Sequence, residues 1–193
     1  ALAAGILAFA AVQNQDQVGL LLFSDHVEKV IPPAKGRKHV LRLIRDLLEF
    51  EPQGVKTSIH SALEGLRKNL KKHSLVAFLS DFLQMDHLED LQHLNRGHEV
   101  LALHFWDPFE GIVPKVGKFP IQDLETGEIQ WLDSSSKRLR KSLEHFEERS
   151  KFQLQQKFKK MGVDFVRITL KNEFDSTIEP LVQYFYQKKK RRS

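Results

Sequence analysis

The chain contains several continuous apolar runs of strand length, and these runs restrict its fold more than any other feature. Residues 18–25 read VGLLLFSD, and residues 74–80 read SLVAFLS, in which five of the six residues from Leu75 to Ser80 are apolar. Two later runs, HEVLALHFW at 98–106 and VDFVRITL at 163–170, have the same character. A strand without polar alternation is typical of a parallel sheet covered by helices on both faces. We therefore expect each run to be a buried strand.

Stretches with helical periodicity separate these runs. Amphipathic helices are expected at 36–49 and 59–70, with a short helix at about 86–95. An Ala-rich helix, ALAAGILAFAAV, opens the chain, and an amphipathic helix with Ile178, Leu181, Val182 and Phe185 closes it. One long helix carries Leu139, Leu143, Phe146, Leu154, Phe158 and Met161. Strands that alternate with helices predict a doubly wound α/β domain.

Two shorter strand patterns lie outside this alternation. HVEKVIPP at 26–33 alternates and stops at its two prolines, which is typical of a short edge strand. KFPIQDLETGEIQWLD predicts a small β-hairpin insertion near 118–132, turning at residues 125–127.

Composition excludes several classes of protein. Apolar residues make up 41% and charged residues 28% of the 193, as in an ordinary folded domain. The net charge is +5, but residues 188–192 contribute five positive charges, so the rest sums to about zero. We expect residues 1–187 to form one domain with no affinity for nucleic acid, followed by a basic tail at 188–193. The absence of cysteine excludes disulfides and cysteine-based zinc sites, and the opening apolar run is shorter than the roughly 20 residues of a transmembrane helix.

Polar side chains follow the apolar strands, where open α/β sheets bind their ligands. Asp25 follows the first run with Ser24, Asp81 follows the second and Asp107 the third. Thr57 opens the helix that precedes the second of these runs. Hydroxyl and carboxylate oxygens are the ligands that Mg²⁺ prefers. The sequence therefore predicts a candidate Mg²⁺ site at this edge of the sheet.

A structural interpretation of the same residues stays open. α/β proteins often place an aspartate after a strand, so Asp81 can simply end the strand in a turn. Thr57 or Ser58 can be the N-cap of the following helix, a role that contributes about 1 kcal/mol. Ser24 and Asp25 are interpreted as turn residues.

Several segments resemble a known family when taken in order. They are DQVGLLLFSDHVEKVIPPAKGRKHVLRLI, TSIHSALEGL, LVAFLSDF, HEVLALHFWDPFE and DLETGEIQW. Together, over nearly the whole chain, they resemble the bacterial von Willebrand factor A-like proteins catalogued as domain of unknown function 58. The resemblance implies a Rossmann-like, mostly parallel sheet with a metal-ion-dependent adhesion site. That site takes a DxSxS motif after the first strand, a Thr from a second loop and an Asp from a third. Thr57 matches the second element and Asp81 the third.

The chain departs from the family pattern in its first element. No DxSxS motif occurs, and LDSSSK at 132–137 lies in the wrong order. The resemblance places the motif before Ala1, on the central strand between the runs at 18–23 and 74–80. We therefore expect an α/β sheet without its first, central strand, and a metal site that is incomplete in these residues. The facing edges would then either pair directly or stay open. Asp107 and Glu110 of the matched DPFE segment have no role that follows from the sequence.

The resemblance implies a protein-binding module and not an enzyme. A Mg²⁺ ion in the intact protein would bridge the domain to a carboxylate of a partner, which the family suggests is a MoxR-type AAA+ ATPase in the cytoplasm. The alternative is a Mg²⁺-dependent hydrolase or phosphoryl-transfer enzyme that uses the carboxylates at the strand ends. No nucleophile–base pair is visible, which favours the binding module. The nine histidines show no pair four residues apart and are interpreted as structural or surface residues.

Overall fold

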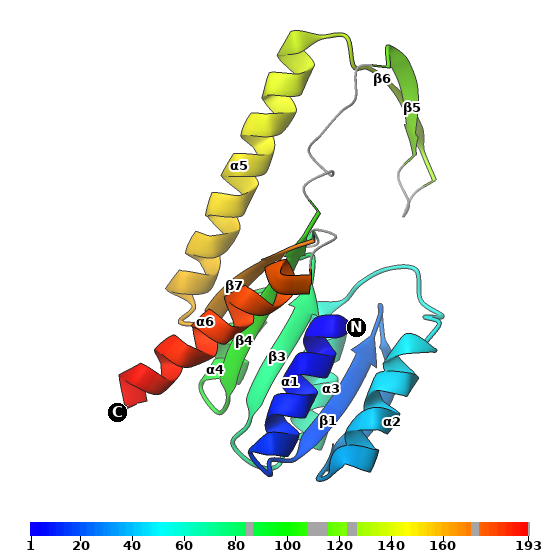
Figure 1. Ribbon diagram of the computed structural model, residues 1–193. Coiled ribbons are helices and arrows are strands. Elements are labelled where there is room, and N and C mark those ends of the chain that lie inside the picture. Colours follow the sequence, from blue (N-terminus) through cyan, green and yellow to red (C-terminus); the bar gives the residue numbers. More distant parts are fainter. Residues whose placement is uncertain (84–86, 108–115, 123–126, 171–173, 193) are drawn as a thin grey trace.

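The computed structural model describes residues 1–83, 87–107, 116–122, 127–170 and 174–192. Its helices and strands follow the predicted order (Figure 1). The helices are α1 (Leu2–Gln13), α2 (Arg37–Leu48), α3 (Ile59–Asn69), α4 (Asp90–Asn95), α5 (Lys137–Lys160) and α6 (Phe174–Arg192). The strands are β1 (Val18–Phe23), β2 (Val27–Ala34), β3 (Leu75–Ser80), β4 (Glu99–Trp106), β5 (Lys118–Gln122), β6 (Ile129–Asp133) and β7 (Asp164–Thr169).

A parallel three-stranded sheet forms the centre of the fold. β4 lies between β3 and β7, with Leu75 opposite Glu99 and Leu101 opposite Asp164. Successive side chains of a strand point to opposite faces, and β4 is buried on both: Val100 belongs to one core cluster and Leu101 to the other. The expectation from the apolar run at 98–106 is therefore confirmed.

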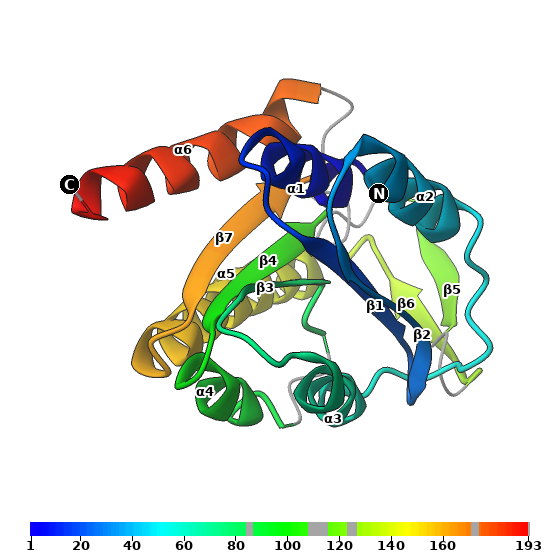
Figure 2. The ribbon, with the colours of Figure 1, turned by 90° about the horizontal axis from the view of Figure 1, so that it is seen from below.

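Helices cover both faces of this sheet (Figure 2). α3, α4 and α5 supply the larger core cluster, in which Phe158 is fully buried. α1 and α6 lie on the other face, where Ala3 and Leu181 pack against β4 and β7. The mixed α/β class is thus confirmed. Of the long-helix pattern, Leu154 and Phe158 are buried, whereas the side chains at 139, 143 and 146 lie outside the described residues.

β1 and β2 form a separate antiparallel hairpin. β2 is an edge strand as predicted, but it continues through both prolines to Ala34. The ladder shifts register beside Gly19, where a Cβ would lie 3.0 Å from the nitrogen of Pro33. The bulge and the glycine leave room for the proline ring.

β1 and β3 share a core but no hydrogen-bonded ladder. The rings of Phe23 and Phe78 lie 6.5 Å apart, and Leu21 packs against the same cluster. Among the described strands, β1 pairs only with β2, and β3 pairs only with β4. Of the two outcomes expected for these edges, the open one holds. The single mostly parallel sheet that we expected is therefore divided into separate sheets.

The hairpin insertion predicted near 118–132 is confirmed as β5 and β6, which pair from Lys118–Asp133 to Gln122–Ile129. It lies at the far end of α5 from the parallel sheet (Figure 1). Its turn was predicted at residues 125–127, of which 125 and 126 lie outside the described residues. Over the residues that the structure covers, none of the helices has the length and apolar character needed to cross a membrane.

Candidate functional site

The loop that carries Thr57 is hydrogen-bonded to the turn that follows β1. The Ser58 amide donates to the Ser24 carbonyl at 2.8 Å, and the Ser61 hydroxyl donates to the Asp25 carbonyl at 2.8 Å. The Ser58 hydroxyl also accepts from the Ser61 amide at 3.2 Å, so Ser58 is the N-cap of α3. Thr57 is exposed beside this cap, and of the two predicted N-cap candidates Ser58 is the correct one.

Glu28 is the main anchor of this loop, and no motif in the sequence points to it. Its side chain is 5% exposed and accepts hydrogen bonds from the Ser24 hydroxyl at 2.7 Å and from the amides of Gln53 and Gly54 at 2.9 Å. The Gly54 amide and the Ser24 hydroxyl lower the pKa of Glu28 because they stabilise its charged form. A Cβ on Gly54 would fall on the Ser24 hydroxyl and the Asp25 carboxylate, so this close approach requires glycine.

His26 lies between the two carboxylates of the turn. Its Nδ1 is 2.6 Å from Asp25 Oδ1, and its Nε2 is 3.4 Å from Glu28 Oε2. The hydrogen bond with Asp25 raises the pKa of His26 and lowers that of Asp25.

A serine–histidine–aspartate relay needs the serine and the aspartate on different ring nitrogens. Ser24 Oγ is 3.4 Å from the same Nδ1 that meets Asp25, and its hydroxyl donates to Glu28. The cluster therefore lacks the geometry of an activated nucleophile. It fits the expected role of Ser24 and Asp25 as turn residues.

Asp81 directly follows β3 and is exposed. Its Oδ1 accepts from the Leu83 amide at 3.2 Å, and the Ser80 hydroxyl accepts from the Phe82 amide at 3.0 Å. Phe82 has a φ of 51° and its ring is buried in the core. Asp81 thus makes the turn foreseen in the structural interpretation, which leaves its carboxylate at the surface.

Within the described residues, no hydrogen bond joins Asp81 to Thr57. The structure therefore places both predicted ligands at the surface without showing them in one coordination shell. Asp107 is half-buried at the end of β4, and Glu110 lies outside the described residues.

A second group of potential metal ligands lies between α3 and α4. His60, His87 and Asp90 each offer an atom within 4.8 Å of the other two, and His60 Nδ1 is 3.1 Å from Asp90 Oδ2. The hydrogen bond from His60 lowers the pKa of Asp90. The sequence predicts structural or surface roles for these histidines, because no two histidines lie four residues apart. No local pattern connects residues 60 and 87.

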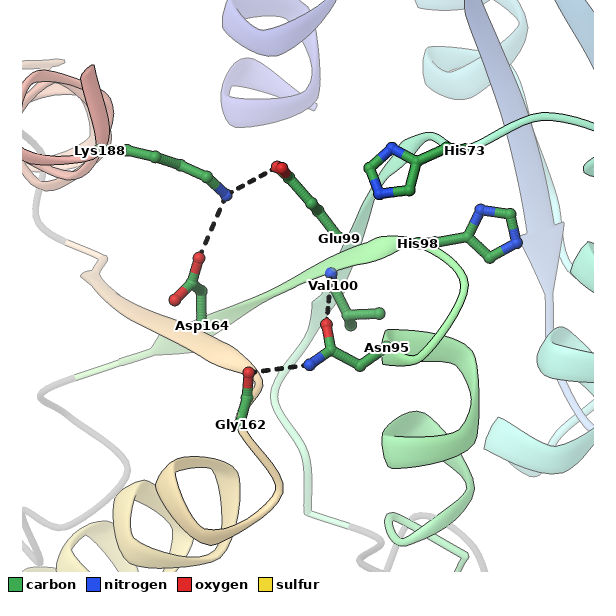
Figure 3. Close-up of a pocket in the computed structure, with 8 residues that line it drawn as sticks. All are labelled: His73, Asn95, His98, Glu99, Val100, Gly162, Asp164 and Lys188. Carbon is green, nitrogen blue, oxygen red and sulfur yellow. Dashed lines mark hydrogen bonds and ion pairs between the residues drawn. The ribbon is translucent and has the colours of Figure 1, made fainter. Parts of the chain in front are cut away.

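A cavity of about 400 Å³ opens where β4 and β7 begin (Figure 3). Lys188 Nζ lies 2.9 Å from Glu99 Oε2 and 3.2 Å from Asp164 Oδ2, and the Tyr184 hydroxyl donates to Asp164 at 2.6 Å. Burial lowers the pKa of Lys188, but its bonds to Tyr184 and Glu99 outweigh this effect and raise it overall. Lys188 opens the predicted basic tail, yet it lies within α6 and its side chain is only 20% exposed.

Comparison with known proteins identifies relatives of this chain. The model of the family described as "Protein of unknown function DUF58" matches residues 1–153. The chain is 27% identical over 131 residues to uncharacterized protein Rv1480 of Mycobacterium tuberculosis. The matched residues cover 66% of this chain and 41% of that relative. It is 30% identical over 100 residues to uncharacterized protein MAV169 of Mycobacterium avium, covering 50% of this chain and 59% of the relative.

The chain thus spans about two fifths of the length of the first relative and about three fifths of the second. No solved structure matches it significantly. The family model covers most of the chain, including β1 to β6 and the Glu28 anchor. This chain therefore belongs to the DUF58 family.

Proposed function

We propose that this chain is a non-catalytic protein-binding module of the von Willebrand factor A type. In this proposal Thr57 and Asp81 contribute oxygens to a Mg²⁺ ion, and the ion binds a carboxylate of a partner protein. The observation that carries the proposal is the tethering of the Thr57 loop. Through Ser58, this loop is bonded to the turn after β1, and Glu28 holds its other end at Gln53 and Gly54.

The geometry favours the binding of a partner protein over catalysis in two ways. Thr57 and Asp81 are both exposed, so a partner can reach them. The nearby Ser24, Asp25 and His26 do not form a relay that would activate a nucleophile. Because no DxSxS motif occurs in residues 1–193, the proposal requires further ligands from outside this sequence. When bound, the Mg²⁺ ion would supply a positive charge for the partner's carboxylate.

The proposed partner is a MoxR-type AAA+ ATPase, and the proposed location is the cytoplasm. The resemblance of the sequence motifs to MoxR-associated proteins supports the choice of partner, and a chain without cysteine fits a reducing compartment. The net charge of residues 1–187 is about zero, so this domain has no excess positive charge to bind the phosphates of nucleic acid.

The test is a binding measurement with the natural protein at its full length and a MoxR-type ATPase. We expect association in Mg²⁺ that is lost in EDTA and lost in Asp81→Ala. Asp16→Ala removes an exposed carboxylate next to β1 and should leave association unchanged. Association that persists in EDTA, or in Asp81→Ala, would contradict the metal-bridged mode.

A further inference from the structure

The group formed by His60, His87 and Asp90 has features of a built site. The three residues come from different segments: His60 lies in the first turn of α3, Asp90 begins α4, and His87 lies in the turn that precedes α4. Their rings and carboxylate converge, with 5.6 Å between the centroids of the His60 and His87 rings. None of the three is a predicted ligand of the Mg²⁺ site.

Each member of the group is anchored through a neighbour in the chain. Ile59 precedes His60, Leu88 follows His87 and Leu91 follows Asp90, and these three apolar side chains are buried in the larger core cluster. The backbone under each ligand is therefore fixed by packing, whereas the ligands themselves lie at the surface. A rigid backbone reduces the conformational entropy that the three ligands lose when they bind an ion.

The turn at His87 brings its ring toward His60. His87 has a φ of 61°, in the left-handed region that is uncommon for a non-glycine residue. The Asp90 amide donates to the His87 carbonyl at 3.1 Å and closes the turn. Leu88, inside this turn, and Leu91, directly after it, hold the turn against the core.

We propose that His60, His87 and Asp90 bind a Zn²⁺ ion at the surface between α3 and α4. Two imidazoles and one carboxylate are a usual donor set for this ion, whose bonds to nitrogen and oxygen are about 2.0–2.2 Å. Ligand atoms around a tetrahedral zinc lie roughly 3.3 Å apart. The 3.1 Å between His60 and Asp90 is close to that value, and the ligand atom of the exposed His87 lies within 4.8 Å of the other two.

The fourth position of this ion faces solvent because both histidines are exposed. It is therefore free for water or for a carboxylate or imidazole of another protein. Fe²⁺ also binds two histidines and one carboxylate, in oxygenases that enclose a substrate. Both histidines of this group are exposed, and an exposed group does not enclose a substrate, so the arrangement favours Zn²⁺.

The inference is independent of the proposed Mg²⁺ site, and its test uses the 193-residue chain without a polyhistidine tag. Titration calorimetry with Zn²⁺ should show one saturable site per chain. Co²⁺ in place of Zn²⁺ should give the visible absorption of a tetrahedral site. His60→Ala and His87→Ala should each weaken Zn²⁺ binding by about 100-fold or more, and Asp90→Asn by about tenfold or more.

The matched control is His93→Ala, which removes an exposed histidine from α4 and should leave the affinity unchanged. Asp81→Ala and excess Mg²⁺ should also leave it unchanged, which separates this site from the proposed function. Should a histidine variant fail to fold, NMR of the unmodified chain decides: Zn²⁺ must shift the imidazole signals of His60 and His87 but not that of His93. Absence of Zn²⁺ binding, binding that survives His60→Ala, or loss of binding in Asp81→Ala would overturn the proposal.

Discussion

Glu28 accepts a hydrogen bond from the backbone amide of Gly54 at 2.9 Å, although the two residues are 26 positions apart in the chain. This contact joins the start of β2 to the loop that carries Thr57. The same carboxylate also holds Ser24 and Gln53, so one side chain fixes the position of the loop.

The first prediction concerns Glu28. We expect Glu28→Gln to lower the thermal midpoint by several degrees at pH 7, because the amide group of glutamine is a poorer acceptor for three donors. The pKa of Glu28 is lowered in the folded state. Its contribution is therefore complete above the ordinary glutamate pKa and is lost as the pH falls through the lowered value. Melting curves at pH 7 and pH 3 should show a larger variant effect at pH 7 than at pH 3. Glu51→Gln, at an exposed position, should have little effect at either pH.

The second prediction concerns the close approach at Gly54. In Gly54→Ala the new Cβ would lie 2.8 Å from the Ser24 Cβ and would also collide with the Asp25 carboxylate. We expect a loss of about 1–3 kcal/mol in the free energy of unfolding, as in other overpacked sites. Gly97→Ala is the control, because a Cβ there meets nothing within 4 Å. Equal urea midpoints for the two variants would show that the turn after β1 can shift to accept the new Cβ without a loss of stability.

The third prediction concerns the end of α6. Lys188 pairs with both Glu99 and Asp164 and is mostly buried. We expect Lys188→Met to cost about 1–2 kcal/mol, a value reduced for the partial exposure of its partners. Lys190→Met, at an exposed position, should be neutral. In the same way, ending the chain after Gln187 should lower the thermal midpoint more than ending it after Lys188. Identical midpoints would mean that Lys188 contributes no more than a solvated tail.

The fourth prediction concerns catalysis. A protein-binding module should show no Mg²⁺-dependent hydrolysis of p-nitrophenyl phosphate or ATP above background. The physical reason is that the described turn residues do not activate a nucleophile, since Ser24 and Asp25 meet the same nitrogen of His26. Turnover that disappears in Asp81→Asn would favour the hydrolase alternative instead.

The fifth prediction concerns the open edges of β1 and β3. Unpaired strand edges are templates for association with another chain. We expect the 193-residue chain to self-associate with rising concentration in sedimentation experiments. Leu75→Lys, on β3, should weaken this association, whereas Leu48→Lys, on α2 and more exposed than Leu75, should not. A strictly monomeric chain with one cooperative thermal transition would show that these edges are protected.

The local pattern of the sequence determined the helices and strands. A strand buried on both faces is apolar at most of its positions, so the run at 98–106, which is apolar apart from its polar start and His104, predicted β4. An amphipathic repeat predicts a helix with one buried face. A serine or threonine directly before such a repeat predicts its N-cap, as Ser58 is for α3. The hairpin of β5 and β6 was predictable for the same reason, because its alternation and its turn lie within one short segment.

The tertiary structure alone decided how these elements are joined. Hydrophobic patterning predicts that β1 and β3 pack into a core, but not whether their edges share hydrogen bonds, and β1 is in fact only partly buried. Glu28 and Gly54, or His60 and Asp90, meet across 26 and 30 positions of chain. Lys188 belongs to the fold because the sheet places Glu99 and Asp164 beside it, whereas its sequence neighbours suggest a solvated tail. The periodicity of the sequence indicates which face of a helix or strand is buried. The hydrogen-bond partner of each polar side chain depends instead on how whole helices and strands pack together.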